Sequence, residues 1–343
     1  MLPAQHDPGP GGRERPSSPY APQRQRARVR YGGKVTVYVA GHRGMVGSAV
    51  WRALEAQGGV DLVGRASAEL DLRDREATFD FVADTRPNTV VIAAAKVGGI
   101  LANSTQPVQF LSDNVRIQTN LLDACHAADV ERVLFLGSSC IYPRLAPQPI
   151  REDSLLTGPL EPTNEAYAIA KIAGVLHVQG YRHQYGRRWV SAMPTNLYGP
   201  GDNFDLDSSH VLPAMIAKYH HAAVKGTGVT LWGSGSPKRE FLHVDDVASA
   251  VLTILERYDE DPPLNVGTGE DLSIRELAQK VATVVGFEGD TVWDSSKPDG
   301  TPRKLLDVSR LMALGWVPSI GLDDGLRATY EWFLAASGSV RRP

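Results

Sequence analysis

A tyrosine and a lysine four residues apart are the clearest candidates for chemistry in this sequence. Tyr167 and Lys171 occur in Tyr-Ala-Ile-Ala-Lys, a pattern that predicts a helix with both side chains on one face, about one turn apart. A cation beside a phenol favours the phenolate and lowers the phenol pKa from its usual value of about 10. The pair therefore suits proton transfer in a hydride-transfer reaction.

A second motif, Gly-Ser-Ser-Cys-Ile-Tyr at residues 137–142, adds a hydroxyl and a thiol at the end of a predicted strand. Ser138 can polarise a carbonyl group. Cys140 offers a candidate thiolate base at a position where an unreactive residue would be sufficient for packing. Together the two motifs predict hydride transfer and acid–base chemistry in one pocket.

The elements that position these side chains alternate between predicted strands and longer helices. Buried strands are expected at residues 34–40, 89–95, 133–136 and 189–194. Such alternation predicts an α/β fold: a Rossmann-type doubly wound parallel sheet with helices on both faces. We expect a cofactor-binding domain at residues 34–196 with 238–268, and a smaller mixed α/β substrate-binding domain at residues 197–237 with 269–337.

A glycine-rich turn joins the first predicted strand to a helix that runs to about Gln57. Gly41 permits a tight turn, Gly44 lets the backbone approach a pyrophosphate, and Gly47 lets the helix pack on the strand. The N-terminal amides of the helix would then point at the anion. The glycines alone could be ordinary turn residues, but the strand before them and the helix after them favour a dinucleotide site.

The end of the second predicted strand favours NADP over NAD. It lacks the acidic residue that would hold both ribose hydroxyls of NAD, whereas Arg43 and Arg65 are placed to meet a 2′-phosphate. The alternative is that both arginines are solvated surface residues. Asp71 and Leu72 follow at a spacing suited to flanking the adenine. Lys96, after the third strand, is either a site cation or an ordinary loop lysine.

Composition excludes several classes of protein. The chain has 343 residues, of which 42% are hydrophobic, and a formal net charge of −3, which does not favour nucleic acid. No apolar run approaches the roughly 20 residues that a membrane span needs. The two cysteines, Cys125 and Cys140, cannot form a disulfide framework or a cysteine-rich metal site, and they predict a cytoplasmic location.

The first 30 residues differ from the rest because they hold six prolines and six arginines with little apolar content. Such a segment cannot bury enough surface to offset its ordering entropy. We expect residues 1–33 to form a disordered tail, either inert or a weak anion-binding arm.

The motifs after residue 34 resemble those of the GDP-L-fucose synthases, NADPH-dependent enzymes of the extended short-chain dehydrogenase/reductase superfamily. The most specific strings are Ser-Ser-Cys-Ile-Tyr-Pro at residues 138–143 and Lys-Pro-Asp-Gly-Thr-Pro-Arg-Lys at residues 297–304. The resemblance implies conversion of GDP-4-keto-6-deoxy-D-mannose to GDP-L-fucose by 3,5-epimerisation and 4-keto reduction. For the 2′-phosphate that family often has an arginine near the position at which this chain has Ser67. Arg43 and Arg65 would have to meet the 2′-phosphate in its place.

The resemblance also implies a role for individual residues. Cys140 matches the base and His210 the acid of epimerisation; Tyr167 matches the proton donor of reduction, Lys171 its partner and Ser138 the group that orients the keto oxygen. Expected NADP(H) contacts are Gly41, Arg43, Gly44, Met45, Val46, Gly47, Arg65, Asp71, Leu72, Leu136, Gly137, Ser138, Ser139, Lys171, Pro194, Thr195, Asn196, Leu197 and His210. Expected contacts to the GDP-sugar are Lys218, Trp232, Arg239 and Asp299. Superfamily members often pair through the helix of the Tyr/Lys motif, which implies a homodimer.

Alternatives remain for single residues and for the whole chain. A lone His210 would be structural, Trp232 could belong to the core, and His243 is interpreted as structural. A sugar-nucleotide 4,6-dehydratase would carry an Asp-Glu pair in place of Ser139 and Cys140, and a 4-epimerase would leave Cys140 and His210 idle. A non-catalytic NADP-sensing regulator would not need Tyr167 or Lys171.

Overall fold

The computed structural model describes residues 35–206, 208–297 and 299–336, all of which fall in one compact unit. The tail expected at residues 1–33 lies outside the described residues. The strands are β1 (Val35–Ala40), β2 (Val60–Val63), β3 (Thr89–Ile92), β4 (Arg132–Leu136), β5 (Val190–Pro194), β6 (Asn196–Tyr198), β7 (Val229–Trp232), β8 (Lys238–Arg239), β9 (Phe241–His243), β10 (Leu264–Val266), β11 (Leu272–Ser273), β12 (Thr291–Asp294) and β13 (Arg303–Lys304).

The helices are α1 (Met45–Gln57), α2 (Arg75–Thr85), α3 (Ile100–Thr105), α4 (Pro107–Ala127), α5 (Glu165–Tyr185), α6 (Val211–Lys225), α7 (Val244–Arg257), α8 (Ile274–Val285), α9 (Ser309–Ala313) and α10 (Leu322–Ala336). Short 3-10 turns form η1 (Ser139–Ile141), η2 (Glu152–Ser154) and η3 (Pro162–Asn164). Local signals set several helix ends: α5 ends at Gly186, which adopts a left-handed conformation, and α8 begins with a capping box between Ser273 and Glu276.

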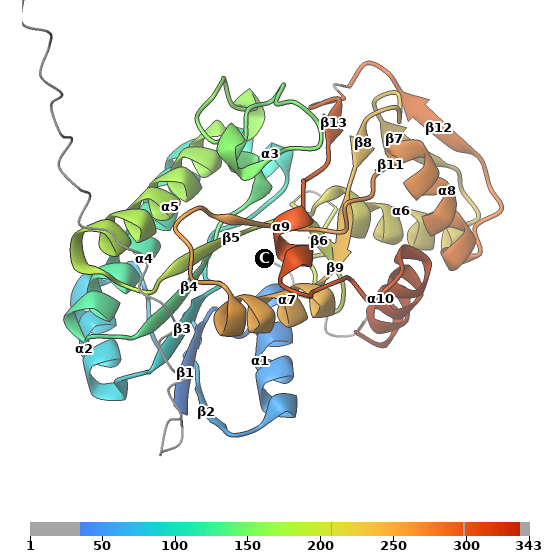
Figure 1. Cartoon of the computed structure of the whole chain (residues 1–343). Helices are drawn as coiled ribbons and strands as arrows, with labels where there is room; N and C mark the ends of the chain where they lie inside the picture. The colour runs from blue at the N-terminus through green and yellow to red at the C-terminus, as the bar shows by residue number, and fades with distance from the viewer. Residues whose placement is uncertain (1–34, 207, 298, 337–343) are drawn as a thin grey trace, which may run out of the picture. The chain divides into compact units, whose positions relative to one another are not determined.

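Within the described residues, six strands form a parallel sheet in the order β10-β5-β4-β3-β1-β2. This confirms the expected α/β fold. Successive side chains of β4 enter different cores, since Val133 and Phe135 lie in one apolar cluster and Leu134 and Leu136 in another. Helices α2, α4 and α5 cover the first face, and α1 and α7 cover the second (Figure 1). Strands β4 and β5 are buried at every position because both faces are covered.

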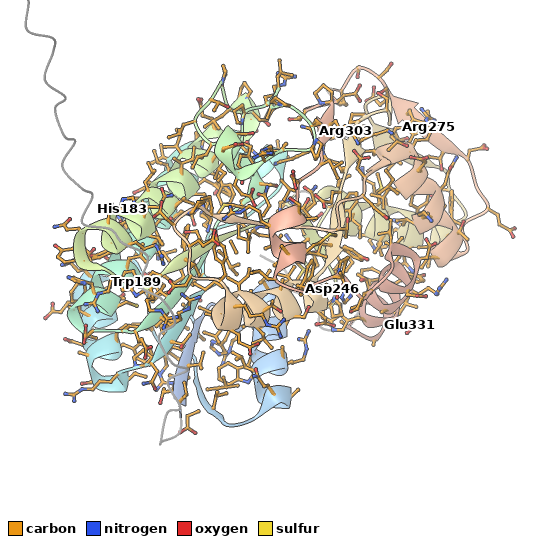
Figure 2. All side chains as sticks on the ribbon, in the orientation of Figure 1. His183, Trp189, Asp246, Arg275, Arg303 and Glu331 are labelled. Atoms are coloured by element: carbon orange, nitrogen blue, oxygen red, sulfur yellow. The ribbon has the colours of Figure 1, made fainter. Side chains whose placement is uncertain are left out.

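A third apolar cluster lies apart from the two faces of the sheet. It joins α6, α8 and α10 with β7, through residues such as Met215, Leu277 and Phe333. Figure 1 shows these elements grouped on the side of the sheet's carboxyl ends. Asp246 lies at the start of α7 (Figure 2). Its buried carboxylate accepts hydrogen bonds from Ser319 and Ile320, which fixes the segment before α10. We propose that this region is the substrate-binding part.

The chain leaves β1 for β2 on one side of the sheet and reaches β3 on the other, which opens a crevice at the carboxyl ends of β1 and β3. Gly41 follows β1 with φ of +85°, and a Cβ there would lie 2.8 Å from the Ala94 backbone. A Cβ at Gly47 would lie only 2.1 Å from the Gly41 carbonyl oxygen. Both positions therefore require glycine, for the turn and the helix packing that the sequence predicts.

Candidate active site

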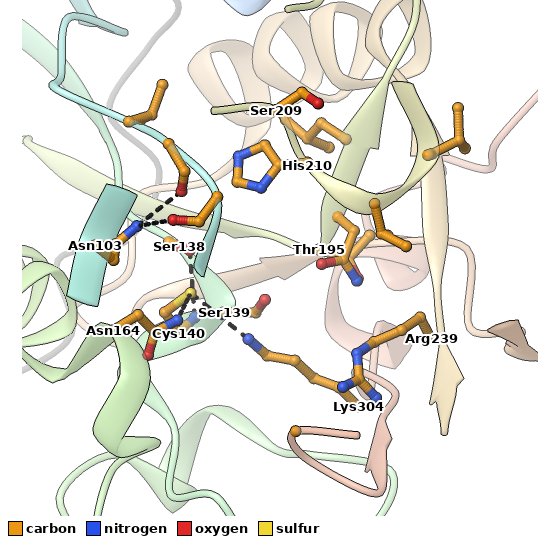
Figure 3. Close-up of a pocket in the computed structure, with 18 of the residues that line it drawn as sticks. Asn103, Ser138, Ser139, Cys140, Asn164, Thr195, Ser209, His210, Arg239 and Lys304 are labelled. Atoms are coloured by element: carbon orange, nitrogen blue, oxygen red, sulfur yellow. Dashed lines mark hydrogen bonds between the residues drawn. The ribbon is translucent and has the colours of Figure 1, made fainter. Parts of the chain in front are cut away.

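A cavity of about 840 Å³ lies at the carboxyl ends of the parallel strands. One side is formed by the N-terminus of α1 and the segments after β3, β4 and β5. The other is formed by α6, β7, β8 and the segment up to Lys304. Figure 3 shows side chains from both sides facing the same space. Its volume is in the range typical of ligand-binding sites.

Most of the residues expected from the sequence line this cavity. They are Gly44, Met45, Val46, Gly47, Leu136, Gly137, Ser138, Ser139, Cys140, Tyr167, Lys171, Pro194, Thr195, Asn196, Leu197, His210, Lys218, Trp232, Arg239 and Asp299. Outside the lining, among the described residues, are Gly41, Arg43, Arg65, Asp71 and Leu72.

The N-terminus of α1 provides a place for an anion. Gly44 precedes the helix, no side chain caps its first turn, and that turn contains no acidic residue. The backbone amides of this turn are therefore available to a phosphate group, whose charge the helix dipole favours. The close approach of Gly47 to Gly41 keeps this end of the helix against the sheet, so the residues present fit the pyrophosphate of a dinucleotide.

Tyr167 and Lys171 lie on α5, as the spacing predicts. The Lys171 ammonium is buried, donates a hydrogen bond to the Leu136 carbonyl oxygen at 2.8 Å, and lies 5.9 Å from the centre of the Tyr167 ring. Burial lowers the pKa of Lys171 to about 8.

The expected lowering of the Tyr167 pKa is wrong for this structure. Burial of the phenol raises its pKa, the negative charge of Cys140 adds to the increase, and a hydrogen bond with the Ser138 side chain opposes it. Desolvation is the largest cause, and the Lys171 ammonium is bonded to the Leu136 carbonyl oxygen rather than to the phenol. Tyr167 is therefore a protonated phenol at neutral pH, the form that can donate a proton.

Cys140 lies in η1, directly after β4, where the Ser138 side-chain oxygen accepts a hydrogen bond from the Cys140 amide at 3.3 Å. Two side chains donate to its sulfur: Asn164 Nδ2 at 3.3 Å and Lys304 Nζ at 3.7 Å (Figure 3). Sequence analysis assigned no role to either donor. Lys304 ends the family-specific string at residues 297–304, which was the only signal that could have found it.

His210 precedes α6 and faces the cavity from a different element than Cys140 (Figure 3). By surface area the His210 side chain is exposed, although many protein atoms surround the imidazole. This burial, followed by the positive charge of Lys304, lowers the pKa of His210. The imidazole is therefore mainly neutral at pH 7, because its pKa ordinarily lies near 6.5.

Cations gather at the end of the cavity expected to take the diphosphate. Lys218 and Arg239 line it, and burial lowers the pKa of both. Trp232 does not belong to the core, since 57% of its surface is exposed, and Lys218 Nζ lies 5.8 Å from its ring centre. Asp299 accepts hydrogen bonds from the Ser234 amide at 2.7 Å and the Ser234 hydroxyl at 2.8 Å, which fixes the loop after β7.

Arg43 and Arg65 lie near each other outside the cavity. The hydrogen bond from the Ala66 amide lowers the pKa of Glu69, and the charges of both arginines contribute to the same direction. This carboxylate, to which no sequence motif pointed, brings a negative charge to the expected 2′-phosphate site.

Asp71 and Lys96 both form ion pairs beside the sheet. Asp71 pairs with Arg73 at 2.8 Å. Lys96 lies outside the cavity lining, 4.0 Å from Asp113 and over the Phe110 ring, which favours its interpretation as a loop lysine.

None of the helices in the described ranges is long and apolar enough to span a membrane.

Comparison with known proteins gives a consistent result along the chain. Residues 37–267 match the NAD dependent epimerase/dehydratase family. The chain is 55% identical to GDP-L-fucose synthase of Escherichia coli (strain K12), over 88% of this chain and 97% of that protein.

Two further comparisons agree. GDP-L-fucose synthase 1 of Arabidopsis thaliana is 54% identical over 87% of this chain and 93% of that protein. The crystal structure of a GDP-L-fucose synthetase from Naegleria fowleri bound to NADP superposes with a TM-score of 0.82 at 29% identity, over 90% of this chain and 96% of that one. This chain therefore belongs to the GDP-L-fucose synthases of the NAD dependent epimerase/dehydratase family.

Proposed function

We propose that this protein converts GDP-4-keto-6-deoxy-D-mannose to GDP-L-fucose with NADPH, by epimerisation at carbons 3 and 5 followed by reduction at carbon 4. The observation that supports this most directly is the shared cavity. It holds Tyr167 and the buried Lys171 beside Ser138, and a cysteine whose sulfur accepts from an ammonium group. A 4-epimerase would need only Tyr167, Lys171 and Ser138, and would have no use for Cys140. A dehydratase would carry an Asp-Glu pair at the positions that Ser139 and Cys140 occupy in this chain.

The epimerisation half rests on Cys140 and His210. The 4-keto group makes the protons on carbons 3 and 5 acidic, so a base can remove one and an acid can return one to the other face through an enolate. Cys140 Sγ takes the proton, since a thiolate is the basic form of cysteine. His210, on a different element of the same cavity, returns a proton to the opposite face of the sugar from its protonated form, which is the minor form at pH 7 because its pKa is lowered.

The reduction half rests on the residues around Tyr167. Reduced nicotinamide supplies the hydride when the cofactor is bound. The Tyr167 hydroxyl donates a proton to the oxygen at carbon 4, and the raised pKa of Tyr167 keeps that proton in place until negative charge develops on the substrate. The Ser138 hydroxyl orients the keto oxygen, and Lys171, fixed by the Leu136 carbonyl, places its charge behind the phenol.

NADPH rather than NADH is the proposed cofactor, and Arg43 and Arg65 support it, although Glu69 partly neutralises them. If one arginine–phosphate contact contributes about 1.5–3 kcal/mol, Arg65→Ala should narrow the preference for NADPH by about tenfold or more. Titrating both cofactors by fluorescence measures this preference. Equal binding of NADPH and NADH by the unsubstituted protein would refute the proposal for the cofactor.

The test of the epimerisation half is NMR of the keto sugar in deuterium oxide, first without and then with NADPH. The unsubstituted protein should exchange the protons on carbons 3 and 5 and release GDP-L-fucose. Cys140→Ser should fold and bind NADPH but lose the exchange, because a hydroxyl is a far weaker acid than a thiol. Unchanged exchange in Cys140→Ser would show that another group is the base.

We also propose a homodimer formed through α4 and α5, and a cytoplasmic location. The dimer is supported by large apolar side chains exposed on these helices, among them Val108, Ile169 and Leu176. The location is supported by Cys125 and Cys140, which are both free thiols. Light scattering checks the first proposal: Ile169→Glu combined with Leu176→Glu should give a monomer.

A further inference from the structure

Lys304 lies beside the sulfur of Cys140, and nothing in the chemistry above uses its charge. Its Nζ atom is 3.7 Å from Cys140 Sγ, while Asn164 Nδ2 approaches the same sulfur at 3.3 Å from the start of α5 (Figure 3). In both contacts the nitrogen is the donor and the sulfur of Cys140 is the acceptor. A sulfur held by an ammonium group and an amide N–H is an environment that favours the thiolate over the thiol.

The position of Lys304 is set by the backbone around it. Strand β13 pairs with β8, so that Lys304 is the register partner of Arg239, and both side chains face the cavity. The next two residues are tied on both sides. The Leu305 amide donates to Gln148 Oε1 at 2.9 Å, and the buried carboxylate of Glu240 accepts from the Leu306 amide at 3.1 Å. The ammonium group therefore extends toward the sulfur from a fixed frame.

We propose that Lys304 is a positioning residue that holds Cys140 as the thiolate in the resting enzyme. The use of that thiolate as a base rests on the proposed function, but the ion pair does not. The same charge disfavours protonation of His210 across the cavity. The lysine charge therefore favours the basic form of Cys140 and makes the protonated, acid form of His210 a minor species at neutral pH.

The ion pair can be measured without substrate or cofactor, by the rate at which iodoacetamide alkylates Cys140 as a function of pH. Mass spectrometry of the Cys140 peptide reads the rate. Cys125 is fully buried and serves as an internal control for folding, while Cys140→Ser gives the background. Because only the thiolate reacts, Lys304→Met should slow alkylation at about pH 7 by about tenfold and move the rate profile to higher pH.

Three further variants separate charge from other effects. Lys304→Arg keeps a cation and should preserve most of the rate. Lys304→Gln keeps a donor without charge and should behave like Lys304→Met. Lys238→Met removes a lysine from the same strand ladder that does not line the cavity, and it should leave the rate unchanged.

Equal rates and equal profiles for Lys304→Met and the unsubstituted protein would overturn the proposal, and so would a Lys304→Gln variant that matches the unsubstituted protein. If alkylation of Cys125 shows that the lysine variants are partly unfolded, the ultraviolet absorbance of the thiolate in the unsubstituted protein tests the ion pair instead. The unsubstituted protein should show it at about pH 7 relative to Cys140→Ser, and its appearance only at a pH above the usual thiol value of about 8.5 would exclude the pair. Should the ion pair be found while the NMR exchange fails, the proposed function is wrong and the ion pair stands.

Discussion

The two sides of the cavity differ in the groups that they present: main-chain atoms and small residues on one side, charged side chains on the other. The side formed by the N-terminus of α1 and the segment after β3, here called the backbone wall, consists mainly of glycines, small residues and main-chain amides. The opposite side, here called the charged wall, consists of the side chains of Lys218, Arg239, Asp299 and Lys304. A dinucleotide pyrophosphate can be held by the amides at the N-terminus of α1, whereas the side chains of Lys218 and Arg239 offer cations to the diphosphate of a second nucleotide.

This difference determines how each wall responds to substitution. At Gly47 a single added carbon would meet main-chain atoms, which cannot rotate away. On the charged wall, Trp232 is largely exposed and Lys218 is partly exposed, so a larger or smaller side chain there can be accommodated by displacing or admitting water. We expect the backbone wall to be sensitive to volume and the charged wall to be sensitive to charge. For the reactive groups between the two walls, such as Tyr167, we expect activity to depend on the single proton that each group donates or accepts.

The largest effect is expected between the walls, at Tyr167. Tyr167→Phe removes the proton donor of reduction and keeps the ring, so NADPH oxidation should fall by about 100-fold or more. Deuterium exchange into the keto sugar should persist, because Cys140 and its two donors are untouched. Stopped-flow absorbance and NMR measure the two reactions. Loss of both would show that Tyr167 also serves epimerisation.

The backbone wall is tested by Gly47→Ala. The new Cβ would lie 2.1 Å from the Gly41 carbonyl oxygen, so α1 must shift. We expect the free energy of unfolding to fall by about 1–3 kcal/mol and NADPH binding to weaken with it. Gly180→Ala, in α5, is the matched control, because a Cβ there meets nothing within 4 Å. That variant should gain up to about 1 kcal/mol. Equal responses at the two glycines would contradict the description of this wall.

A substitution of charge tests the charged wall. Arg239→Met keeps most of the side-chain volume and removes a cation from the cavity, so KM for the GDP-sugar should rise by about tenfold or more. NADPH affinity should not change, since we propose that the cofactor binds against the backbone wall. Lys238→Met, next in sequence but outside the cavity lining, should leave KM unchanged. Steady-state kinetics measure KM for both variants. An equal rise in KM for Arg239→Met and Lys238→Met would show that the loss of any nearby positive charge has the same effect.

The smallest effect concerns Lys171 and pH. Its pKa is lowered to about 8 by burial, so the unfolded chain binds more protons than the folded one between about pH 8 and pH 10. Stability therefore rises with pH in this window by at most about 1.4 kcal/mol per pH unit from this group. Lys171→Met should remove that slope in urea titrations. A parallel pH dependence in the two proteins would mean that Lys171 remains charged in the fold.

Much of the backbone wall could be predicted from the sequence because its determinants are local. Gly41, Gly44 and Gly47 act within one turn and the helix that follows it, and the predicted strand and helix have nearly the bounds that were expected. The helical spacing of Tyr167 and Lys171 is local in the same way. The family-specific strings also indicated the activity, with which the full-length relatives agree.

The sequence by itself determined which groups are present, the alternation of strands and helices, and the geometry of interactions a few residues apart. Only the tertiary structure decided how distant groups meet. The Lys304–Cys140 contact joins residues 164 positions apart, and it exists because β13 pairs with β8 while η1 follows β4. The direction of the Tyr167 pKa was decided there too, because desolvation, its largest cause, depends on everything packed around the phenol and not on the spacing to Lys171.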